Sequence, residues 1–529
     1  MISNFYQIIE KNSINKPNAT VIFQNDLELT NLQLKHKVDA CASKLYFEIG
    51  VKPEDKVAIF MHNDWQFIAS IFAISKIGAT PVIVNHFLTA QELATVLTNS
   101  KAKYLITCFK LVDVVANTDQ ITNIIKIMIS DSPNNAQLKK SWVKYNNFFE
   151  IDTIKDSPTV AQSIDELAII FYTSGTTGVS KGVCLSYRNI FANIEACQKH
   201  LSLKPKEAHM ICYLPMFHSF NFTVAIMLPL YLNSFLVVVQ GLSGGNALKK
   251  LFEAVVRFKI CYFLGVPQIF NKLAKIKIPL SFQLVHKIKG FICGSAPLAH
   301  HVIEEFNHNL RFSQKWLKKG YLLQGYGLTE HAPVVATNQP KHNKLGSVGK
   351  PLPGVKVEIK DESGNNVANN QVGEIYIKSD SIMMGYLNNT EATNLVINSG
   401  WLKTGDIGQL DEEGFLYILD RKKDLIISKG MNIYPSEIES VILAHDKVEA
   451  VGIIGVQDND LDEYSVAYIE PKKNEVITEE EIKQTLTKLA RYKHPKYYFI
   501  MPNLPKNAMG KVLKPKLKED VKNRLSNPK

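Results

Sequence analysis

The feature that most constrains the fold is an alternation of short apolar runs with amphipathic patterns in the first 130 residues. Residues 56–60 are typical of a strand, residues 65–76 of a helix and residues 80–84 of the next strand. Such alternation is typical of a parallel sheet covered by helices. A polar stretch at residues 131–163 breaks the pattern, and we expect it to be a surface excursion. The alternation then resumes to about Thr337, so the sequence predicts an α/β fold.

A different pattern follows this alternation. Residues 346–418 show short strands with Gly and Asn turns, which predict a small antiparallel β subdomain. A polar segment at 420–424 is a candidate hinge, and the remaining strand and helix signals predict a compact α+β domain of about 110 residues. We therefore expect an N-terminal domain at 1–420, with two α/β subdomains and a β subdomain, and an α+β domain at 421–529.

The positive charge is concentrated near the end of the chain. The 529 residues include 61 Lys and Arg against 50 Asp and Glu, a formal net charge of +11. Residues 491–529 hold 11 of these basic residues and only two acidic ones, so the rest is nearly neutral. A basic surplus suits nucleic acid, an anionic membrane surface or an anionic small substrate. We expect the anionic partner to meet this segment.

Cysteine usage and hydropathy favour a reducing, cytoplasmic setting. The seven cysteines are scattered and form no CxxC pair, which argues against a disulfide framework and a zinc site. The first residues show no signal-peptide pattern. Residues 222–240 are long enough to cross a bilayer, but Pro229 interrupts them, and a buried helix followed by a strand at 235–239 is favoured. We expect no transmembrane segment and leave peripheral membrane contact open.

The strongest local motif is Tyr172-Thr-Ser-Gly-Thr-Thr-Gly-Val-Ser-Lys-Gly182, directly after an apolar run at 167–171. Its glycines permit tight backbone turns, its hydroxyl groups add donors, and its lysine supplies a point charge, so it can wrap a polyphosphate. The spacing differs from the Walker A loop. A flexible hairpin turn is the alternative. The candidate phosphate ligands are Thr173, Ser174, Gly175, Thr176, Thr177, Gly178 and Lys181.

With this loop the chain resembles the acyl-adenylate-forming enzymes, the family of acyl-CoA synthetases, luciferases and peptide-synthetase adenylation domains. One departure is Ser180, where the family has proline. Further matches follow in the family's order: Leu214-Pro-Met-Phe-His218, Gly294-Ser-Ala-Pro297, Tyr326-Gly-Leu-Thr-Glu330, Gly373-Glu374, Trp401-Leu-Lys-Thr-Gly-Asp406, Asp420-Arg421 with Lys423, and Pro505-Lys-Asn-Ala-Met-Gly-Lys511. Taken singly, Thr329 is as well explained by a helix cap and Asp406 by a turn. Taken together and in this order, the motifs favour a functional role for these residues.

The resemblance implies a nucleotide site. A carboxylate must attack the α-phosphate of ATP, so the charge of the departing pyrophosphate has to be neutralised. Glu330 is implied as the Mg²⁺ ligand, a hard oxygen suited to that ion. Thr329 is implied as a donor to the α-phosphate, and Asp406 and Arg421 as ribose contacts. The implied adenine pocket comprises Gly294, Ser295, Ala296, Pro297, Gln324, Gly325, Tyr326 and Gly327.

The resemblance also implies a second set of residues that serves two half-reactions. Lys511 would bridge carboxylate and phosphate oxygens during adenylation; the alternative is one more lysine of the basic tail. His218 would gate and orient the acyl group rather than act as a base, because a carboxylate is already ionised at neutral pH. Gly430, Met431 and Asn432 would line the tunnel for the CoA thiol. Because this loop and Lys511 share one domain, that domain must rotate, with Lys423 as hinge.

The predicted activity is ATP-dependent conversion of a carboxylic acid to acyl-AMP and pyrophosphate, followed by transfer to CoA. The motifs resemble medium- and long-chain fatty acyl-CoA synthetases most closely, and ATP, Mg²⁺ and CoA are implied, whereas nucleic acid is not. The alternatives are a ligase that loads an acyl or aryl group onto a carrier protein, and a non-catalytic nucleotide- or lipid-binding member. Tyr187 and Asp462-Glu463 also depart from the family pattern.

Overall fold

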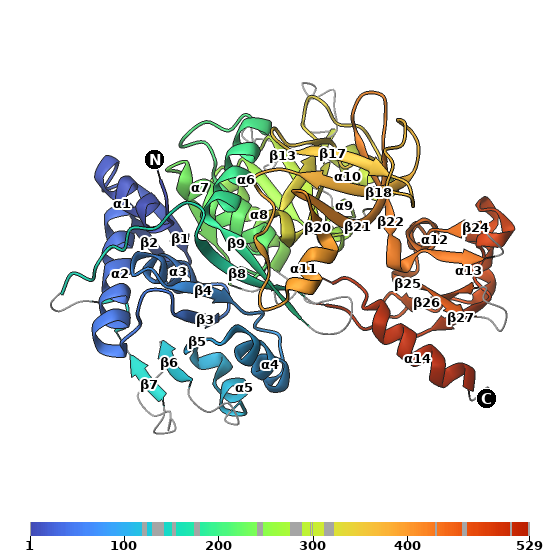
Figure 1. Ribbon diagram of the computed structural model, residues 1–529. Helices are drawn as coiled ribbons and strands as arrows, with labels where there is room; N and C mark the ends of the chain where they lie inside the picture. The colour runs from blue at the N-terminus through green and yellow to red at the C-terminus, as the bar shows by residue number, and fades with distance from the viewer. Residues whose placement is uncertain are drawn as a thin grey trace.

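A computed structural model shows a large body followed by a small C-terminal domain, drawn in orange to red in Figure 1. It describes residues 2–118, 124–129, 142–145, 147–150, 155–173, 180–240, 247–275, 288–296, 298, 300–311, 322–428, 431–457, 463–507 and 510–526. The predicted α/β body with a smaller α+β domain is confirmed. Within those ranges, every helix is too short or too polar to reach across a bilayer.

The first half of the body is built on an eight-stranded sheet in the order β19-β9-β8-β4-β3-β5-β6-β7. Pairing is parallel from β8 to β7 and antiparallel at β9 and β19. The bounds are β3 (Lys56–Phe60), β4 (Thr80–Ile83), β5 (Tyr104–Cys108), β6 (Ile125–Ile129), β7 (Trp142–Tyr145), β8 (Leu167–Thr173), β9 (Lys181–Ser186) and β19 (Gly385–Tyr386).

This sheet confirms the predicted strands and corrects one expectation. β3 and α3 (Trp65–Lys76) have the predicted bounds, and β4 ends one residue early. The polar stretch after residue 130 was expected to be a surface excursion, but Trp142 begins an edge strand and is buried. Trp142 packs against the core beneath α4 (Ala90–Ser100), so one apolar anchor offsets the polar composition around it.

A nine-stranded sheet forms the second half of the body, in the order β16-β15-β14-β13-β12-β10-β11-β1-β2. Its central strands are parallel and its ends antiparallel. The bounds are β1 (Thr20–Gln24), β2 (Leu27–Thr30), β10 (Met210–Cys212), β11 (Leu236–Val238), β12 (Tyr262–Gly265), β13 (Gly290–Cys293), β14 (Leu322–Gly327), β15 (Val334–Thr337) and β16 (Lys350–Pro351). The carboxyl ends of β13 and β14 are neighbours, which places two predicted site segments side by side.

Helices cover both sheets and share one continuous apolar core with them. Residues 222–240 confirm the prediction of buried structure: a π-helix (Asn221–Met227) and α7 (Leu228–Tyr231) lead into β11. The remaining helices of the body are α1 (Tyr6–Asn15), α2 (Asn31–Ser43), α5 (Val112–Ala116), α6 (Tyr187–His200), α8 (Ala247–Arg257), α9 (Pro267–Ala274) and α10 (His300–Arg311), besides a π-helix at Lys44–Ile49 and a 3₁₀ turn at Phe109–Leu111.

The predicted antiparallel β subdomain is present. It pairs β17 (Lys356–Lys360), β18 (Gly373–Lys378), β21 (Trp401–Leu410), β20 (Ile397–Asn398) and β22 (Leu416–Arg421), with α11 (Thr390–Val396) beside them. In the β21–β22 pair, Asp406 lies directly opposite Arg421. This register decides the geometry of one wall of the site described below.

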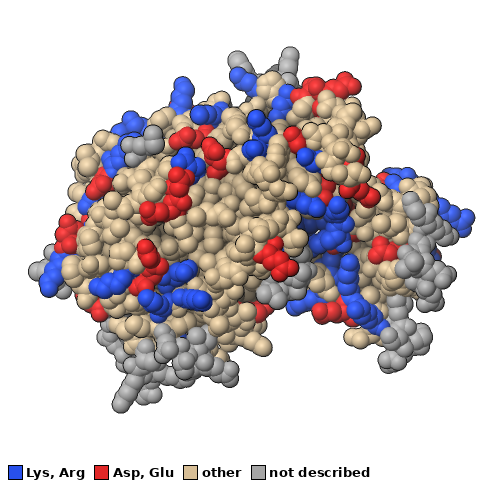
Figure 2. Space-filling view, viewed as in Figure 1, with Lys and Arg blue, Asp and Glu red and all other residues tan. Residues whose placement is uncertain are grey.

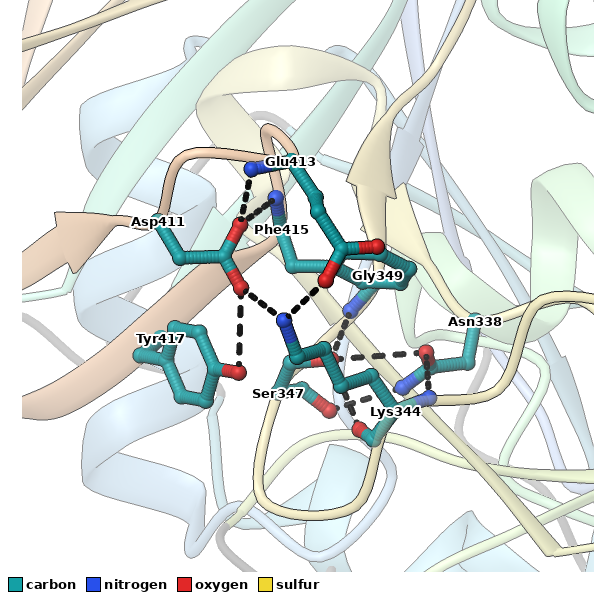
Figure 3. A network of polar contacts seen from close by, with 8 residues as sticks. All are labelled: Asn338, Lys344, Ser347, Gly349, Asp411, Glu413, Phe415 and Tyr417. Atoms are coloured by element: carbon teal, nitrogen blue, oxygen red, sulfur yellow. Dashed lines mark hydrogen bonds and ion pairs between the residues drawn. The ribbon is translucent and has the colours of Figure 1, made fainter. Parts of the chain in front are cut away.

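A polar network anchors the turn between β21 and β22 (Figure 3). Lys344 Nζ lies 2.6 Å from Asp411 Oδ2 and 2.7 Å from Glu413 Oε1. The hydroxyl group of Tyr417 donates to the same Asp411 oxygen at 3.2 Å. Asn338 accepts from the Lys344 N–H at 3.1 Å, so the loop before β16 is tied to this hairpin. The network holds the strand pair that carries Asp406 and Arg421.

The small domain has its own apolar cores. It begins after a 3₁₀ turn (Lys422–Asp424) at the predicted hinge, while the boundary between residues 420 and 421 stays a prediction. Its elements are β23 (Ile426–Ser428), β24 (Met431–Ile433), α12 (Pro435–Leu443), β25 (Val448–Gln457), β26 (Glu463–Pro471), α13 (Glu479–Thr485), two 3₁₀ turns (Leu486–Lys488 and Arg491–Lys493), β27 (Tyr497–Ile500) and α14 (Lys514–Ser526). β25, β26 and β27 form its three-stranded sheet.

Candidate active site

A cavity of about 690 Å³ is lined by residues of the body and of the small domain. It collects most of the residues predicted from sequence, which lie far apart in the chain. These are Thr173, Lys181, His218, Gly294, Ser295, Gly325, Tyr326, Gly327, Thr329, Glu330, Arg421, Lys423 and Lys511. Asp406 contacts two of them, Tyr326 and Arg421. Ser174, Gly175, Thr176, Thr177, Gly178, Pro297 and Gly430 lie outside the described residues.

The predicted ribose contacts form a preassembled cluster. Asp406 is 3% exposed, and its Oδ1 lies 2.9 Å from Arg421 Nε across the strand pair. The Tyr326 hydroxyl group donates to Asp406 Oδ2 at 2.5 Å. The carboxylate raises the pKa of Arg421, which therefore stays charged. Asp406 lies within β21 rather than in a turn, so the turn explanation weighed from sequence is wrong.

The predicted adenine pocket lies at the ends of β13 and β14. Gly294 and Ser295 follow β13, and Tyr326 is near the end of β14. A Cβ on Gly327 would lie 2.2 Å from the carbonyl oxygen of Pro333, so only glycine fits there. Ala296 and Gln324 adjoin this wall without lining the cavity themselves. The structure therefore brings this predicted group together at one edge of the sheet.

The phosphate motif connects two antiparallel strands. Thr173 at the end of β8 pairs with Lys181 at the start of β9, and both line the cavity. The motif therefore joins two antiparallel strands, as the alternative of a hairpin supposed. The residues at its two ends, Thr173 and Lys181, face the predicted site. Lys181 Nζ lies 4.8 Å from the centre of the Tyr386 ring. A cation at this position can meet an anion that enters the cavity.

Thr329 and Glu330 form a 3₁₀ turn (Thr329–His331) at the cavity wall. The Thr329 hydroxyl group lies 3.0 Å from that of Ser219, and Glu330 Oε1 accepts a hydrogen bond from Tyr386 at 2.9 Å. Within the described ranges, no three His, Cys, Asp or Glu residues cluster as metal ligands. Proteins usually bind Mg²⁺ through one or two carboxylates together with substrate phosphates, so a lone Glu330 fits that ion.

His218 contributes a neutral ring to the cavity. Burial lowers its pKa to about 4, and the Phe220 N–H donates to its Nδ1 at 3.4 Å. An imidazole that is neutral at physiological pH and already accepts a hydrogen bond at Nδ1 offers its Nε2 side to a ligand. These observations agree with the expectation that His218 orients a ligand rather than removing a proton.

One part of the cavity is apolar. Cys197 of α6, Val224 of the π-helix, Ile292 of β13 and Val334 of β15 line it, together with Leu201. Asn193 Nδ2 donates to the Val334 carbonyl oxygen at 2.8 Å, which fixes α6 against β15. Among the described lining residues, these elements supply no charged side chain. This part suits an uncharged group.

The Lys511 loop enters the cavity from the small domain. Gly510 has φ +78°, and the Lys511 N–H donates to Asn507 Oδ1 at 2.9 Å, which shapes the turn. Gln268 Nε2 of α9 donates to the Gly510 carbonyl oxygen at 3.0 Å, and a Cβ on Gly510 would overlap the Gln268 side chain. Burial and the neighbouring Arg421 lower the pKa of Lys511. The body therefore holds this loop at the site through Gln268.

Lys423 and the predicted thiol loop differ in their placement. Lys423, expected to be the hinge, also lines the cavity, where burial lowers its pKa. Met431 and Asn432 lie on β24, are exposed and do not line the cavity. In this arrangement Lys511 faces the site and these two residues do not. Their assignment to a thiol tunnel stays a prediction.

The junction of the body and the small domain is basic, as Figure 2 shows. The cations that line the cavity are Lys181, Arg421, Lys422, Lys423, Lys511 and Lys514, against the acidic Glu330 and Asp424. The basic tail predicted from sequence therefore contributes Lys511 and Lys514, while the body and the hinge supply the other cations. Such a field attracts a polyanion.

The departures from the family pattern lie away from this cavity or at its rim. Tyr187 is fully buried at the start of α6, where its hydroxyl group lies 2.9 Å from both Ser75 Oγ and Gln162 Oε1. Glu463 accepts from the Ile427 N–H at 2.9 Å and so ties β26 to β23. Ser180 is half-buried beside the phosphate motif, and Asp462 lies outside the described residues.

Sequence reasoning missed Tyr386, Ser219 and Gln268. Each contacts a predicted site residue: Tyr386 contacts Glu330 and Lys181, Ser219 contacts Thr329, and Gln268 contacts the loop of Lys511. Ser219 directly follows His218, a signal that was available. Gln268 ends the segment Gly265-Val-Pro-Gln268, which resembles a segment of the fatty acyl-CoA synthetases, although no role was assigned to it. Tyr386 carries no local signal, because its partners are distant in the chain.

Comparisons with known proteins agree with this geometry. The chain matches the AMP-binding enzyme family over residues 9–387 and the AMP-binding enzyme C-terminal domain over residues 437–511. A long-chain-fatty-acid–CoA ligase of Escherichia coli O6:H1 is 31% identical over 94% of this chain and 91% of its own length. A 2-succinylbenzoate–CoA ligase of a Geobacillus species is also 31% identical, over 96% of each chain.

A solved structure shares the whole architecture. The o-succinylbenzoate CoA synthetase of Bacillus subtilis with its acyl-adenylate intermediate has a TM-score of 0.83 and 26% identity, covering 97% of each chain. The same enzyme with ATP and a magnesium ion has a TM-score of 0.82, covering 97% of this chain and 99% of its own. The protein therefore belongs to the AMP-binding enzyme family, and the predicted membership of the acyl-adenylate-forming enzymes is confirmed.

Proposed function

We propose that this protein is an acid–thiol ligase that converts a carboxylic acid with an uncharged tail, a medium- or long-chain fatty acid, to its CoA thioester through acyl-AMP. The single observation that carries the proposal is the cavity, which joins a cationic part with Lys181, Arg421 and Lys511 to an apolar part lined by α6 and β15. One cavity can therefore hold a nucleotide and an apolar acid together.

The apolar part favours a tail without a second carboxylate. Its described lining residues include Cys197, Val224 and Val334 and no lysine or arginine that could pair with a distal anion. Burying an unpaired charge there would cost several kcal/mol. The long-chain-fatty-acid ligase and the 2-succinylbenzoate ligase are equally identical to this chain, and this lining supports the fatty acid.

In the first half-reaction, a carboxylate oxygen of the acid bonds to the α-phosphorus of ATP, and the bond to the β-phosphate breaks to release pyrophosphate. Lys511 and Thr329 line the same cavity, and in this proposal they bind the carboxylate and the α-phosphate. Asp406 and Arg421 hold the ribose, and Lys181 binds the departing phosphates. Glu330 would hold Mg²⁺, which would supply neutralisation of the phosphate charge.

In the second half-reaction, the CoA sulfur bonds to the acyl carbon and AMP leaves. Lys511 occupies the cavity here, whereas Met431 and Asn432 lie outside it. Rotation of the small domain about Lys423 would exchange them. His218, neutral at physiological pH, orients the acyl group. A carrier-protein thiol is the second candidate acceptor, because the basic junction suits an acidic partner as well as the phosphates of CoA.

The decisive experiment measures pyrophosphate release across fatty, aromatic and amino acids, each with and without CoA. We expect turnover with fatty acids that depends on CoA. Turnover confined to aromatic or amino acids would contradict the fatty-acid proposal, and release without thioester formation would favour a carrier protein. If no acid leads to pyrophosphate release, the alternative of a non-catalytic nucleotide-binding protein would be favoured.

A variant of the apolar wall tests the acid class separately. Cys197→Phe adds volume within the apolar part, so the longest acids should lose about tenfold in kcat/KM while the shortest are retained. Gln198→Ala, one residue along α6, is the matched control. An equal loss for all chain lengths would show that this wall does not contact the tail.

A further inference from the structure

Tyr386 lies where two parts of the site meet. It ends β19, which pairs with β9, the strand that begins at Lys181. The Leu387 N–H donates to the Gly182 carbonyl oxygen at 2.7 Å, and the Met383 N–H donates to the Glu330 carbonyl oxygen at 2.9 Å. The backbone on either side of Tyr386 is thus tied to the strand of the phosphate lysine and to the turn of Glu330.

The Tyr386 side chain contacts both of these residues. Its hydroxyl group donates to Glu330 Oε1 at 2.9 Å, and its ring lies beneath Lys181, whose Nζ is 4.8 Å from the ring centre. A tyrosine hydroxyl group carries its proton at neutral pH and a carboxylate can only accept, so Tyr386 is the donor in this bond. One aromatic side chain therefore holds an anion and a cation that belong to different elements.

This arrangement leaves both charges available to a ligand. Tyr386 occupies one oxygen of Glu330, so the second oxygen can be presented to a metal ion. Among the described residues, no carboxylate forms an ion pair with Lys181, and the ring positions its ammonium without neutralising it. A carboxylate in the place of the ring would compete with phosphate for the same lysine.

A neighbouring cation explains why such a restraint is needed. Arg421 lines the same cavity as Glu330, so this guanidinium attracts the Glu330 carboxylate. Arg421 already pairs with Asp406. Without the Tyr386 hydroxyl group, Glu330 would be free to turn toward Arg421, away from the phosphate end of the cavity.

We propose that Tyr386 is a positioning residue that sets Glu330 for a divalent cation with its hydroxyl group and Lys181 for nucleotide phosphate with its ring. This inference rests on the proposed function for the roles of Glu330 and Lys181, and it adds a residue to which that proposal assigned no role. It predicts that the two contacts are separable, because one uses only the hydroxyl group and the other only the ring.

The test is calorimetric binding of metal-free ATP and of Mn²⁺–ATP to the intact protein. Tyr386→Phe should weaken Mn²⁺–ATP about tenfold and leave metal-free ATP unchanged, because a hydrogen bond to a charged group is lost while the ring stays. Tyr386→Leu should weaken both. The matched control is Tyr231→Phe, since the Tyr231 hydroxyl group also donates to a glutamate, Glu195, at 2.9 Å but lies outside the cavity.

A double variant distinguishes a specific effect of the hydroxyl group from a general loss of structure. In Glu330→Gln, adding Tyr386→Phe should cause no further loss of metal preference if the hydroxyl group acts through Glu330. The proposal is overturned if Tyr386→Phe weakens both ligands equally, if it weakens neither, or if its effect persists in Glu330→Gln. Because binding needs no turnover, these results are readable even if the acid substrate proves to be different.

Discussion

The two sides of the cavity are built in different ways. On the side of the body, Asp406 and Arg421 face each other across a strand pair, and Tyr326 closes the cluster with a third contact. On the side of the small domain, Lys511 sits on a loop that the body holds through one side-chain hydrogen bond, from Gln268. The first side is fixed by the backbone, whereas the second can be exchanged.

A lysine of each domain lies at the same junction. Burial and the neighbouring Lys275 of the body lower the pKa of Lys472 of the small domain, whereas Asp446 and Glu449 raise it. From the contrast between the two sides, we propose that the fixed residues serve both half-reactions and that Lys511 serves only the first.

The largest expected effect comes from the exchangeable side. Lys511→Ala removes the ammonium that meets the reacting oxygens, so acid-dependent ATP–pyrophosphate exchange should fall by about 10²–10³. Conversion of preformed acyl-AMP to thioester should be retained. Lys516→Ala, an exposed lysine of α14, is the control and should change neither rate. Unchanged exchange in Lys511→Ala would contradict the role of this lysine.

A variant of the fixed side should behave differently. Asp406→Asn weakens the contact with the ribose and leaves Arg421 without its charged partner, so the Kd for both ATP and AMP should rise about tenfold. Both half-reactions should therefore slow together. Asp361→Asn, in an exposed turn of the same subdomain, is the control. A loss of rate confined to adenylation would contradict the distinction between a fixed side that serves both half-reactions and an exchangeable side that serves one.

The contact between the two sides should have a smaller effect. Gln268→Ala removes the hydrogen bond to the Gly510 carbonyl oxygen and should lower the rate of adenylation about fivefold, the effect of one neutral hydrogen bond. Thioester formation from acyl-AMP should be unchanged or faster, because the substitution destabilises the domain position in which Lys511 faces the site, and the small domain must leave that position. Stopped-flow measurement of each half-reaction distinguishes these outcomes. Equal slowing of both would show that Gln268 only supports the fold.

The smallest effect concerns pH. Burial lowers the pKa of His218 to about 4, so kcat/KM for adenylation should show no inflection near pH 6.5 from this residue. Because the unfolded chain binds this proton more readily, stability should fall as pH drops from 6.5 toward 4, by at most about 3 kcal/mol. His218→Asn should lose less stability on acidification. An acidic limb near pH 6.5 that disappears in this variant would indicate a general base instead.

The fold was predictable where apolar runs are bounded by polar residues. β3 and α3 have the predicted bounds because each is a nearly continuous apolar run, and the structure buries almost all of its residues. The antiparallel edges of both sheets and β7 were not predicted. β7 depends on burial of Trp142 against a distant core, which is a tertiary effect that overrides the polar composition around it.

The positions of the site residues were predictable where they belong to short sequence motifs. The segments that carry Lys181, Glu330, Asp406 and Lys511 come together as the ordered motifs implied. The residues that hold these groups were not predictable. Tyr386 and Gln268 contact partners far away in the chain, so the contact of Gln268 was not predictable even though the residue ends a motif, and no motif marks Tyr386.

The most direct measurement of the central claim fixes the small domain in the position seen here. Lys275→Cys with Lys472→Cys, joined by a bismaleimide that spans the junction, would hold the two domains together in this arrangement. Wild-type protein treated with the same reagent controls for its own cysteines. We predict that the joined protein retains ATP–pyrophosphate exchange and loses thioester formation. Retention of both half-reactions in the joined protein would contradict an exchange of Lys511 for the thiol loop.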